Sequence, residues 1–296
     1  MKKSGLALLL VISSLAQAQQ KTAKAPVASN NTLLWKISGK GLVKPSYLFG
    51  TMHILCSDDA RLSPNLNEVI KEVNRIYFEL DMDNPQEMWG AMNHVKMNDN
   101  KKLSDLLTAE EYSRVEKFFQ ENKMPPLSML NTLKPMFASV LISERLMTCE
   151  KKNGMEEQIM AASKNLGKEI FGLETPAYQM GLFDSIPYEE QARSLLGYID
   201  NIDSYREATQ EMVDVYRKQD LKRLDSLVVK SDPGMDKYMD LLLYNRNRNW
   251  VDFFPAIVEG GRNSLLIAVG AGHLPGDKGV ISLLRKAGYT VKPMIN

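Results

Sequence analysis

The sequence predicts an α/β fold in which two βαβ-type halves, with mostly parallel sheet strands, bracket a large helical insertion. Near each end of the chain, an apolar run, a helical pattern and a second apolar run follow one another, as in a βαβ unit. The stretch between the two ends has apolar residues at helical spacing. Each half also carries the motif Gly-x-x-His directly after an apolar run, at Gly50–His53 and at Gly270–His273.

The first residues have the pattern of a signal peptide, which we expect to span 1–18. Two lysines precede an apolar segment that is too short to cross a membrane, and Ala16-Gln17-Ala18 is a typical cleavage site. Residues 19–31 are polar and without period, so we expect a flexible lead-in to a single domain at 32–296. We therefore expect an exported protein, periplasmic or extracellular, with no transmembrane segment in the mature chain.

Composition excludes some classes of partner. The chain has 296 residues and a net charge of +1, and no basic stretch is interleaved with aromatic residues. Because nucleic-acid binding requires such a basic surface, we expect no nucleic-acid partner. The methionines occur at helical core spacing rather than in a cofactor motif, so we also expect no organic cofactor.

The two cysteines, Cys56 and Cys149, would both remain after export. Disulfides persist outside the cytoplasm, so we expect these two residues to pair. The alternative is two separate buried thiols.

The histidine motifs are the strongest functional signal, because they hold two of the three histidines in the chain. In open α/β sheets, ligands bind beyond the carboxyl ends of the strands, where His53 and His273 would lie. Imidazole in such a cleft serves as a general base or a metal ligand. The strand Arg75–Leu80 would bring Glu79 to the same cleft. The simpler alternatives are loop histidines and a solvent-facing glutamate.

Two further groups are candidates with open alternatives. Glu174 follows the apolar run Glu169–Leu173, and it could face the cleft or cap the next helix. Arg246 belongs to a cluster of arginines and asparagines that could orient carboxylates or form a solvated face. Within the helical insertion, we expect a long helix over Leu127–Thr148, kinked at Pro135.

These motifs together resemble the TraB/GumN family, which includes the Tiki proteases. Six pieces occur in the family's order over nearly the whole predicted domain; they are Leu48–His53, Phe78–Asp81, Gly154–Glu156, Gly172–Thr175, Arg246–Trp250 and Val269–Gly276. One departure is Glu156, where the family more often has Asp. The resemblance implies a fold like that of the erythromycin esterases and the haem-uptake protein ChaN. It also implies an active site of His53, His273 and Glu79, supported by Glu174 and Arg246.

The resemblance to Tiki-like members implies a metal-dependent hydrolase. Two imidazoles and a carboxylate leave an open position on a catalytic metal, so His53, Glu79 and His273 are the expected ligands of Mn, Co or Zn. Glu174 or Glu156 would be the general base, and Arg246 would orient a carboxylate or the oxyanion. The substrate would be a peptide or a small amide or ester. The alternatives are a metal-free His/Glu hydrolase and a non-catalytic protein that binds a peptide or another ligand.

Overall fold

The computed structural model describes residues 31–228 and 236–296. The predicted signal peptide, 1–18, and the predicted lead-in up to residue 30 lie outside these ranges. The strands are β1 Leu34–Ser38, β2 Ser46–Thr51, β3 Leu55–Cys56, β4 Arg75–Leu80, β5 Lys152–Asn153, β6 Glu169–Glu174, β7 Leu265–Gly270 and β8 Thr290–Pro293. The α-helices are α1 Pro64–Glu72, α2 Pro85–Ala91, α3 Leu103–Leu106, α4 Ala109–Glu121, α5 Met136–Leu146, α6 Met155–Asn165, α7 Pro176–Leu182, α8 Tyr188–Asp200, α9 Ile202–Arg217, α10 Leu221–Val228, α11 Asn245–Ile257 and α12 Val280–Lys286. Within the described ranges, no helix combines the length and apolar character needed to span a membrane.

A mainly parallel sheet of six strands, in the order β6-β4-β7-β2-β1-β8, is the centre of the fold. The strands β6, β4, β7 and β2 run parallel, and the hairpin partner β1 is antiparallel to both β2 and β8. Every residue of β2 is buried, and so are the first five residues of β7. Such continuous apolar runs are typical of central strands that are covered on both faces. The predicted α/β class with mostly parallel strands is therefore confirmed.

The two predicted βαβ halves are interleaved in this sheet. β2 and β4, the strands of the first expected unit, are parallel but not adjacent, because β7 pairs with both of them. In the second half, β8 pairs with β1 at the far edge instead of with β7. Neither expected unit therefore has its two strands paired directly with each other. The almost fully apolar β7 gains most burial at the centre of the sheet, between two other strands.

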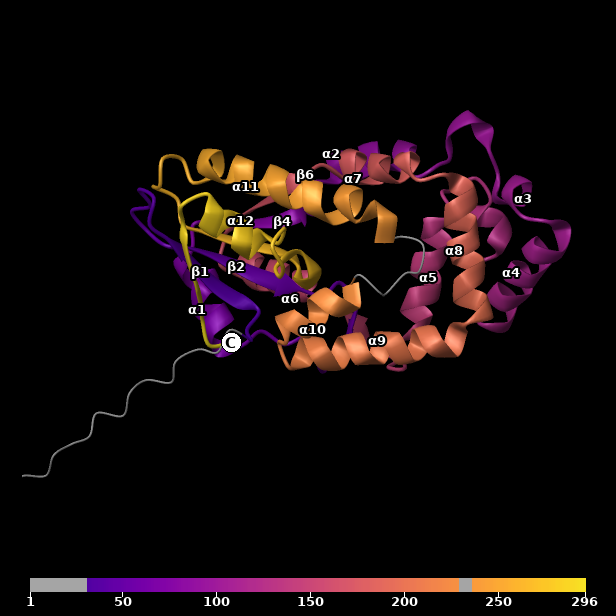
Figure 1. The fold of residues 1–296 in the computed structure, drawn as a ribbon, viewed down its shortest axis with the longest axis horizontal. Helices are drawn as coiled ribbons and strands as arrows, with labels where there is room; N and C mark the ends of the chain where they lie inside the picture. The colour runs from indigo at the N-terminus through magenta and orange to yellow at the C-terminus, as the bar shows by residue number, and fades with distance from the viewer. Residues whose placement is uncertain (1–30, 229–235) are drawn as a thin grey trace, which may run out of the picture.

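Helices cover both faces of the sheet and extend beyond its carboxyl end (Figure 1). α11 and α12 pack together on one face, and α1 and α6 pack together on the other. Helices α3, α4, α5 and α8 lie away from the sheet and enclose a second hydrophobic core, whose buried residues include Val115, Phe119 and Ile142.

The long helix predicted over Leu127–Thr148 is wrong in part, since α5 begins after Pro135. Proline is favourable at a helix start, where its missing N–H needs no partner.

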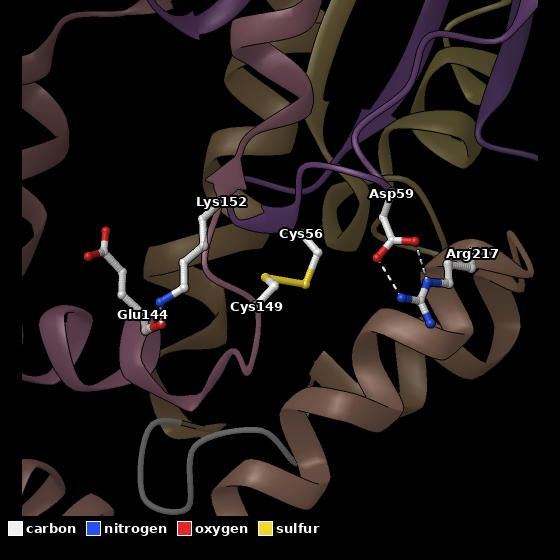
Figure 2. Close-up of a disulfide and its surroundings, with 6 residues drawn as sticks. All are labelled: Cys56, Asp59, Glu144, Cys149, Lys152 and Arg217. Carbon is white, nitrogen blue, oxygen red and sulfur yellow. Dashed lines mark hydrogen bonds and ion pairs between the residues drawn. A yellow bond between two sulfur atoms is a disulfide. The ribbon is translucent and has the colours of Figure 1, made fainter.

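A disulfide joins Cys56 to Cys149, as predicted (Figure 2). The two Cα atoms are 5.7 Å apart, and 93 residues separate the cysteines in sequence. The short ladder of β3 and β5 lies next to it, with Leu55 opposite Asn153. The disulfide and the strand pair therefore both attach the loop after β2 to the segment that leads into α6. A structural disulfide is also what an exported protein would retain.

Loss of this disulfide should destabilise the fold. For the double variant Cys56→Ser/Cys149→Ser, we expect the free energy of unfolding to fall by about 2–4 kcal/mol, because the link closes a long loop in the unfolded chain. Urea denaturation followed by circular dichroism measures this difference. Arg217→Ala is a matched control, because it breaks only ion pairs of an exposed arginine, with Asp59 (Figure 2) and with Asp214, and should cost less than about 1 kcal/mol. Equal midpoints for the double variant and the unaltered protein would contradict the expectation.

Candidate active site

The two Gly-x-x-His segments lie side by side because β2 and β7 are neighbouring parallel strands. Gly50 pairs with Val269, and Thr51 pairs with Gly270. A Cβ atom added at Gly50 would lie 3.1 Å from the Cα atom of Ala271. This distance is too short for an ordinary side-chain contact, so the glycine of the first segment leaves room for the backbone of the second.

His273 is buried and held in one orientation. It ends the short helical turn Ala271–His273, and only 5% of its surface is exposed. Its Nδ1 lies 2.5 Å from Oδ1 of Asn247, and Nδ2 of Asn247 donates to the Lys278 carbonyl at 2.9 Å. The bond from Asn247 Nδ2 to the Lys278 carbonyl fixes the orientation of the Asn247 amide, with its Oδ1 toward the His273 ring. Nδ1 of His273 is therefore the donor, and Nε2 of His273 keeps its lone pair. Burial lowers the pKa of His273, so the ring is neutral.

His53 is more exposed and is paired with a carboxylate. Its Nδ1 lies 2.6 Å from Oε1 of Glu156, and 66% of its side chain is exposed. The contact with Glu156 raises the pKa of His53 to about 9, although burial of the ring acts in the other direction. In the absence of other ligands, this histidine is protonated at neutral pH.

Backbone packing brings Glu156 beneath His53. A Cβ atom at Gly154 would lie only 2.5 Å from the His53 carbonyl oxygen, so the two segments touch at backbone distance. The N–H of Met155 donates to the Met52 carbonyl at 3.1 Å. Glu156 then lies in the first turn of α6, with its Oε2 buried and without a hydrogen-bond partner among the described residues.

Glu79 lies near the end of β4 and contacts the end of β7 and helix α11. Its Oε1 accepts the backbone N–H of Gly270 at 2.8 Å, and its Oε2 accepts Nη2 of Arg246 at 2.6 Å. Burial alone would raise the pKa of Glu79, but the Arg246 guanidinium, the protonated His53 ring and the Gly270 N–H lower it. Glu79 is therefore ionised, as a carboxylate ligand or an electrostatic partner must be.

Arg246, which is 7% exposed, bridges two carboxylates. Its Nε donates to Oε2 of Glu174 at 3.0 Å, its Nη2 donates to both Glu79 and Glu174, and its Nη1 lies 3.3 Å from Nε2 of His273. The capping role considered for Glu174 belongs instead to Thr175, whose hydroxyl accepts the N–H of Tyr178. Arg246 thus orients carboxylates, as one of the two readings predicted, whereas its neighbour Arg248 is exposed.

Two polar residues of this group had no sequence signal strong enough to single them out. Asn247 fixes the orientation of the His273 ring. In the sequence, only its position beside Arg246 in the polar cluster draws attention to it. Gln179 donates from Nε2 to Glu79 at 3.1 Å and to Glu174 at 3.3 Å, from the second turn of α7. The third histidine, His94, is exposed on a short helical turn and does not take part.

The three predicted metal ligands surround one point above Gly270. A Cβ atom at Gly270 would lie 3.2 Å from Oε1 of Glu79, 3.5 Å from Cδ2 of His273 and 3.8 Å from Nε2 of His53. Each imidazole is engaged at Nδ1, as in metal sites where the other nitrogen binds the ion. The donor types therefore fit a divalent ion. As arranged, however, the residues at 31–228 and 236–296 contain no cluster of three acidic, histidine or cysteine side chains close enough to hold a metal. Arg246 lies next to His273 Nε2 instead.

A cavity of about 310 Å³ opens beside these groups at the carboxyl end of the sheet. It is lined by His53, Glu79, Glu156 and Gln179, among others. A ligand of a few residues' size could therefore reach His53 and Glu79 directly.

Filling the space above Gly270 should disturb this group of side chains more than the fold. In Gly270→Ala, the added methyl would lie 3.2 Å from Oε1 of Glu79, so the carboxylate must shift away from its bond with the Gly270 N–H, while the methyl fills the space between the two histidines. We expect at least a tenfold loss of ligand binding or turnover, with a change in unfolding free energy below about 2 kcal/mol. Gly181→Ala in α7 is the control, because nothing lies within 4 Å of the added atom. If Gly270→Ala behaved like this control, the proposed convergence would be wrong.

The His53–Glu156 pair should give a distinctive pH dependence in metal-free protein. The folded pKa of about 9 exceeds the ordinary 6.5, so the stabilisation is complete below about pH 6.5 and is lost as pH rises through 9. NMR titration of the ring protons should show this raised pKa, and Glu156→Gln should lower it. His53→Gln assigns the signal, and His94→Gln should leave it in place. A His53 pKa near 6.5 in the unaltered protein would refute the pairing.

Comparison with known proteins confirms the resemblance to the TraB/GumN family. The sequence model of the TraB/PrgY/gumN family matches residues 33–293. The chain is similar to a protein named Metalloprotease TIKI homolog from Amphimedon queenslandica, with 24% identity over 323 residues that cover 89% of this chain and 62% of that protein. It is also similar to Metalloprotease TIKI1 from Homo sapiens, with 24% identity over 318 residues, 88% of this chain and 62% of that protein. The match thus spans less than two thirds of either relative, and no solved structure matches significantly. With its family model matched over most of its length, the chain belongs to the TraB/PrgY/gumN family.

Proposed function

We propose that this protein hydrolyses a peptide or peptide-like amide bond at the site formed by His53, Glu79 and His273, with the help of a divalent metal ion. The observation that carries the proposal is the convergence of two imidazoles and one carboxylate around Gly270. The relatives named as metalloproteases, which are similar over nearly the whole described chain, support the same chemistry.

The metal would be held by His53, Glu79 and His273, with manganese, cobalt and zinc all compatible with these donors. A divalent ion, when bound, supplies a Lewis acid that polarises the scissile carbonyl. Asn247 contributes by keeping Nε2 of His273 unprotonated, and Glu156 contributes by holding Nδ1 of His53. Arg246 keeps Glu79 ionised.

Glu156 is the better candidate for the general base. Both oxygens of Glu174 accept hydrogen bonds from Arg246, whereas Oε2 of Glu156 has no such partner among the described residues. Because that oxygen is buried at the edge of the cavity, it would take a proton from a water molecule there once the Glu156 side chain turns toward the cavity. Arg246 acts as a positioning residue, because its N–H groups are directed to Glu79, Glu174, His273 and the Leu242 carbonyl, which leaves little capacity for an oxyanion.

One observation favours the metal-free alternative. The guanidinium group of Arg246 lies beside Nε2 of His273, where a cation would repel a second cation. In a metal-free hydrolase, His53 and Glu79 would carry the proton transfers, and chelators would have no effect. A role in the periplasm or outside the cell is part of the proposal in either case, and the Cys56–Cys149 disulfide supports it.

Metal content and cleavage should be measured together. After equilibration with Mn²⁺, Co²⁺ or Zn²⁺, we expect about one bound equivalent in the unaltered protein and none in His53→Ala/His273→Ala, because two of three ligands are lost. A peptide library followed by mass spectrometry should show cleavage that falls at least about 100-fold in the double variant or in chelator. His94→Ala is the matched control for loss of a histidine.

The possible outcomes separate the candidate functions. Cleavage that survives chelation but is lost in His53→Ala would replace the metal mechanism with the metal-free one. Peptide capture without any product, in the presence of each metal, would leave a binding protein.

A further inference from the structure

A second groove lies on the other side of Trp250 and Glu174 from the histidines. It has a volume of about 520 Å³ and lies at the ends of β4 and β6, between α7, α11 and the start of α2. Trp250 separates it from the catalytic group, because its ring packs 4.5 Å from that of His273. Of the residues that line this groove, only Glu174 has a part in the proposed mechanism.

Aromatic side chains form the floor and the rim of the groove. Tyr77 and Trp250 are buried at its base, with 6% and 4% of their surfaces exposed, and Tyr77 stacks on Phe171 at 5.1 Å. Tyr178 and Phe253 are 41% and 43% exposed at its rim. Large aromatic side chains left this exposed on two helices that flank one groove are typical of a binding surface.

The groove is also negatively charged. It is lined by Asp81, Glu87 and Glu174, and no Lys, Arg or His has been found among its described lining residues. Glu174 is paired with Arg246, but Asp81 and Glu87 form no ion pair within the described parts of the chain. Two carboxylates thus face the aromatic groove without a neutralising cation.

Aromatic faces beside uncompensated carboxylates select an organic cation. The negative face of a ring attracts ammonium and guanidinium groups, and the carboxylates add charge attraction. Two of the lining rings already hold such a group from this chain, because Arg246 lies over Trp250 at 4.9 Å and Arg75 lies over Phe171 at 5.4 Å. No cation–ring contact within 31–228 and 236–296 involves Tyr178 or Phe253, so these two rings are left for a cation of the ligand. The indole N–H of Trp250 is buried without a partner in the described chain, and it leaves one donor for a polar group of the ligand.

We propose that this groove binds the side chain of a lysine or arginine in a peptide. The proposal rests on the proposed function in one respect, since that peptide is then the substrate and the groove is its subsite for a basic residue. The side chain would enter between Tyr178 and Phe253, with its stem against the rings and its charge near Asp81 and Glu87. The groove and the catalytic cavity meet at the end of β4, where Asp81 lines the groove and Leu80 and Met82 line the cavity, so one short peptide could occupy both.

Binding can be measured without catalysis in the His53→Ala/His273→Ala protein. We would titrate capped lysine and capped arginine and follow the Trp250 indole N–H signal by NMR, assigned with Trp250→Phe. Capped norleucine, capped glutamate and a neutral oligosaccharide are the comparison probes, and tetramethylammonium tests for a free small cation. We expect the two basic probes to bind at least about tenfold more tightly than norleucine, and less tightly at high salt.

Two variants outside the catalytic group test the contacts. Phe253→Ala should weaken the basic probes roughly two- to fivefold, and Glu87→Gln should weaken them by a similar factor or more. Trp89→Ala, which removes a 77% exposed aromatic outside the groove, should have no effect. Equal binding of norleucine or the oligosaccharide, stronger binding of tetramethylammonium than of either basic residue, or insensitivity to both variants would overturn the proposal.

The cleavage library tests the link to catalysis. If peptides are cleaved, those with a basic residue at one fixed distance from the cut should be enriched, and Glu87→Gln should remove the enrichment while cleavage of other peptides continues. Cleavage with no such preference would overturn the subsite. If no peptide is cleaved, the proposed function fails, and the binding titration still decides whether the groove takes a basic side chain.

Discussion

The bridge from Arg246 to Glu79 and Glu174 is the interaction on which the site depends. All three side chains are buried, and removal of one member of such a group leaves an uncompensated charge, which typically costs about 3–5 kcal/mol. The bridge also connects distant parts of the chain. Glu79 is next to the last residue of β4, Glu174 ends β6 and Arg246 lies in the first turn of α11, so one guanidinium group fixes the carboxyl ends of two strands against the helix that covers them. Glu79 can then bind the Gly270 N–H and connect β4 to β7.

Small residues decide how closely the two histidine segments approach this bridge. Gly50 lets the backbone at Ala271 pack against β2, and Gly270 leaves the space toward which Glu79, His53 and His273 converge. The requirement is steric at both positions, since neither backbone is in the left-handed region. The repeated Gly-x-x-His pattern therefore has a physical explanation. Each strand has a glycine at or next to its last residue, and the missing side chain leaves room there for groups from the neighbouring segments.

Much of this arrangement could be predicted from the sequence, because local signals and strand ends are strong constraints. The bounds of β4 and the start of α1 at Pro64 follow from apolar patterning and capping by Ser63. The position of Glu79 near both histidines follows from parallel strands that share one edge. The central place of β7 could not be predicted in this way, because strand order depends on which apolar surfaces meet across a long helical insertion. Asn247 and Gln179 were missed since a single amide has no local pattern, and their importance depends on what another segment brings near them.

The two sides of the site differ in how deeply their side chains are buried. Glu79, Glu174, Arg246, His273 and Asn247 form a buried set whose polar atoms are largely hydrogen-bonded to one another, so it is rigid and holds a fixed distribution of charge. His53 and Glu156 form the open side, where the ring is exposed and one carboxylate oxygen has no partner among the described residues. That side is held by the β3–β5 ladder and the disulfide rather than by the sheet. Proton transfer requires groups that can gain and lose contacts, so the open side is where reaction would take place, and the buried side supplies the orientation it needs.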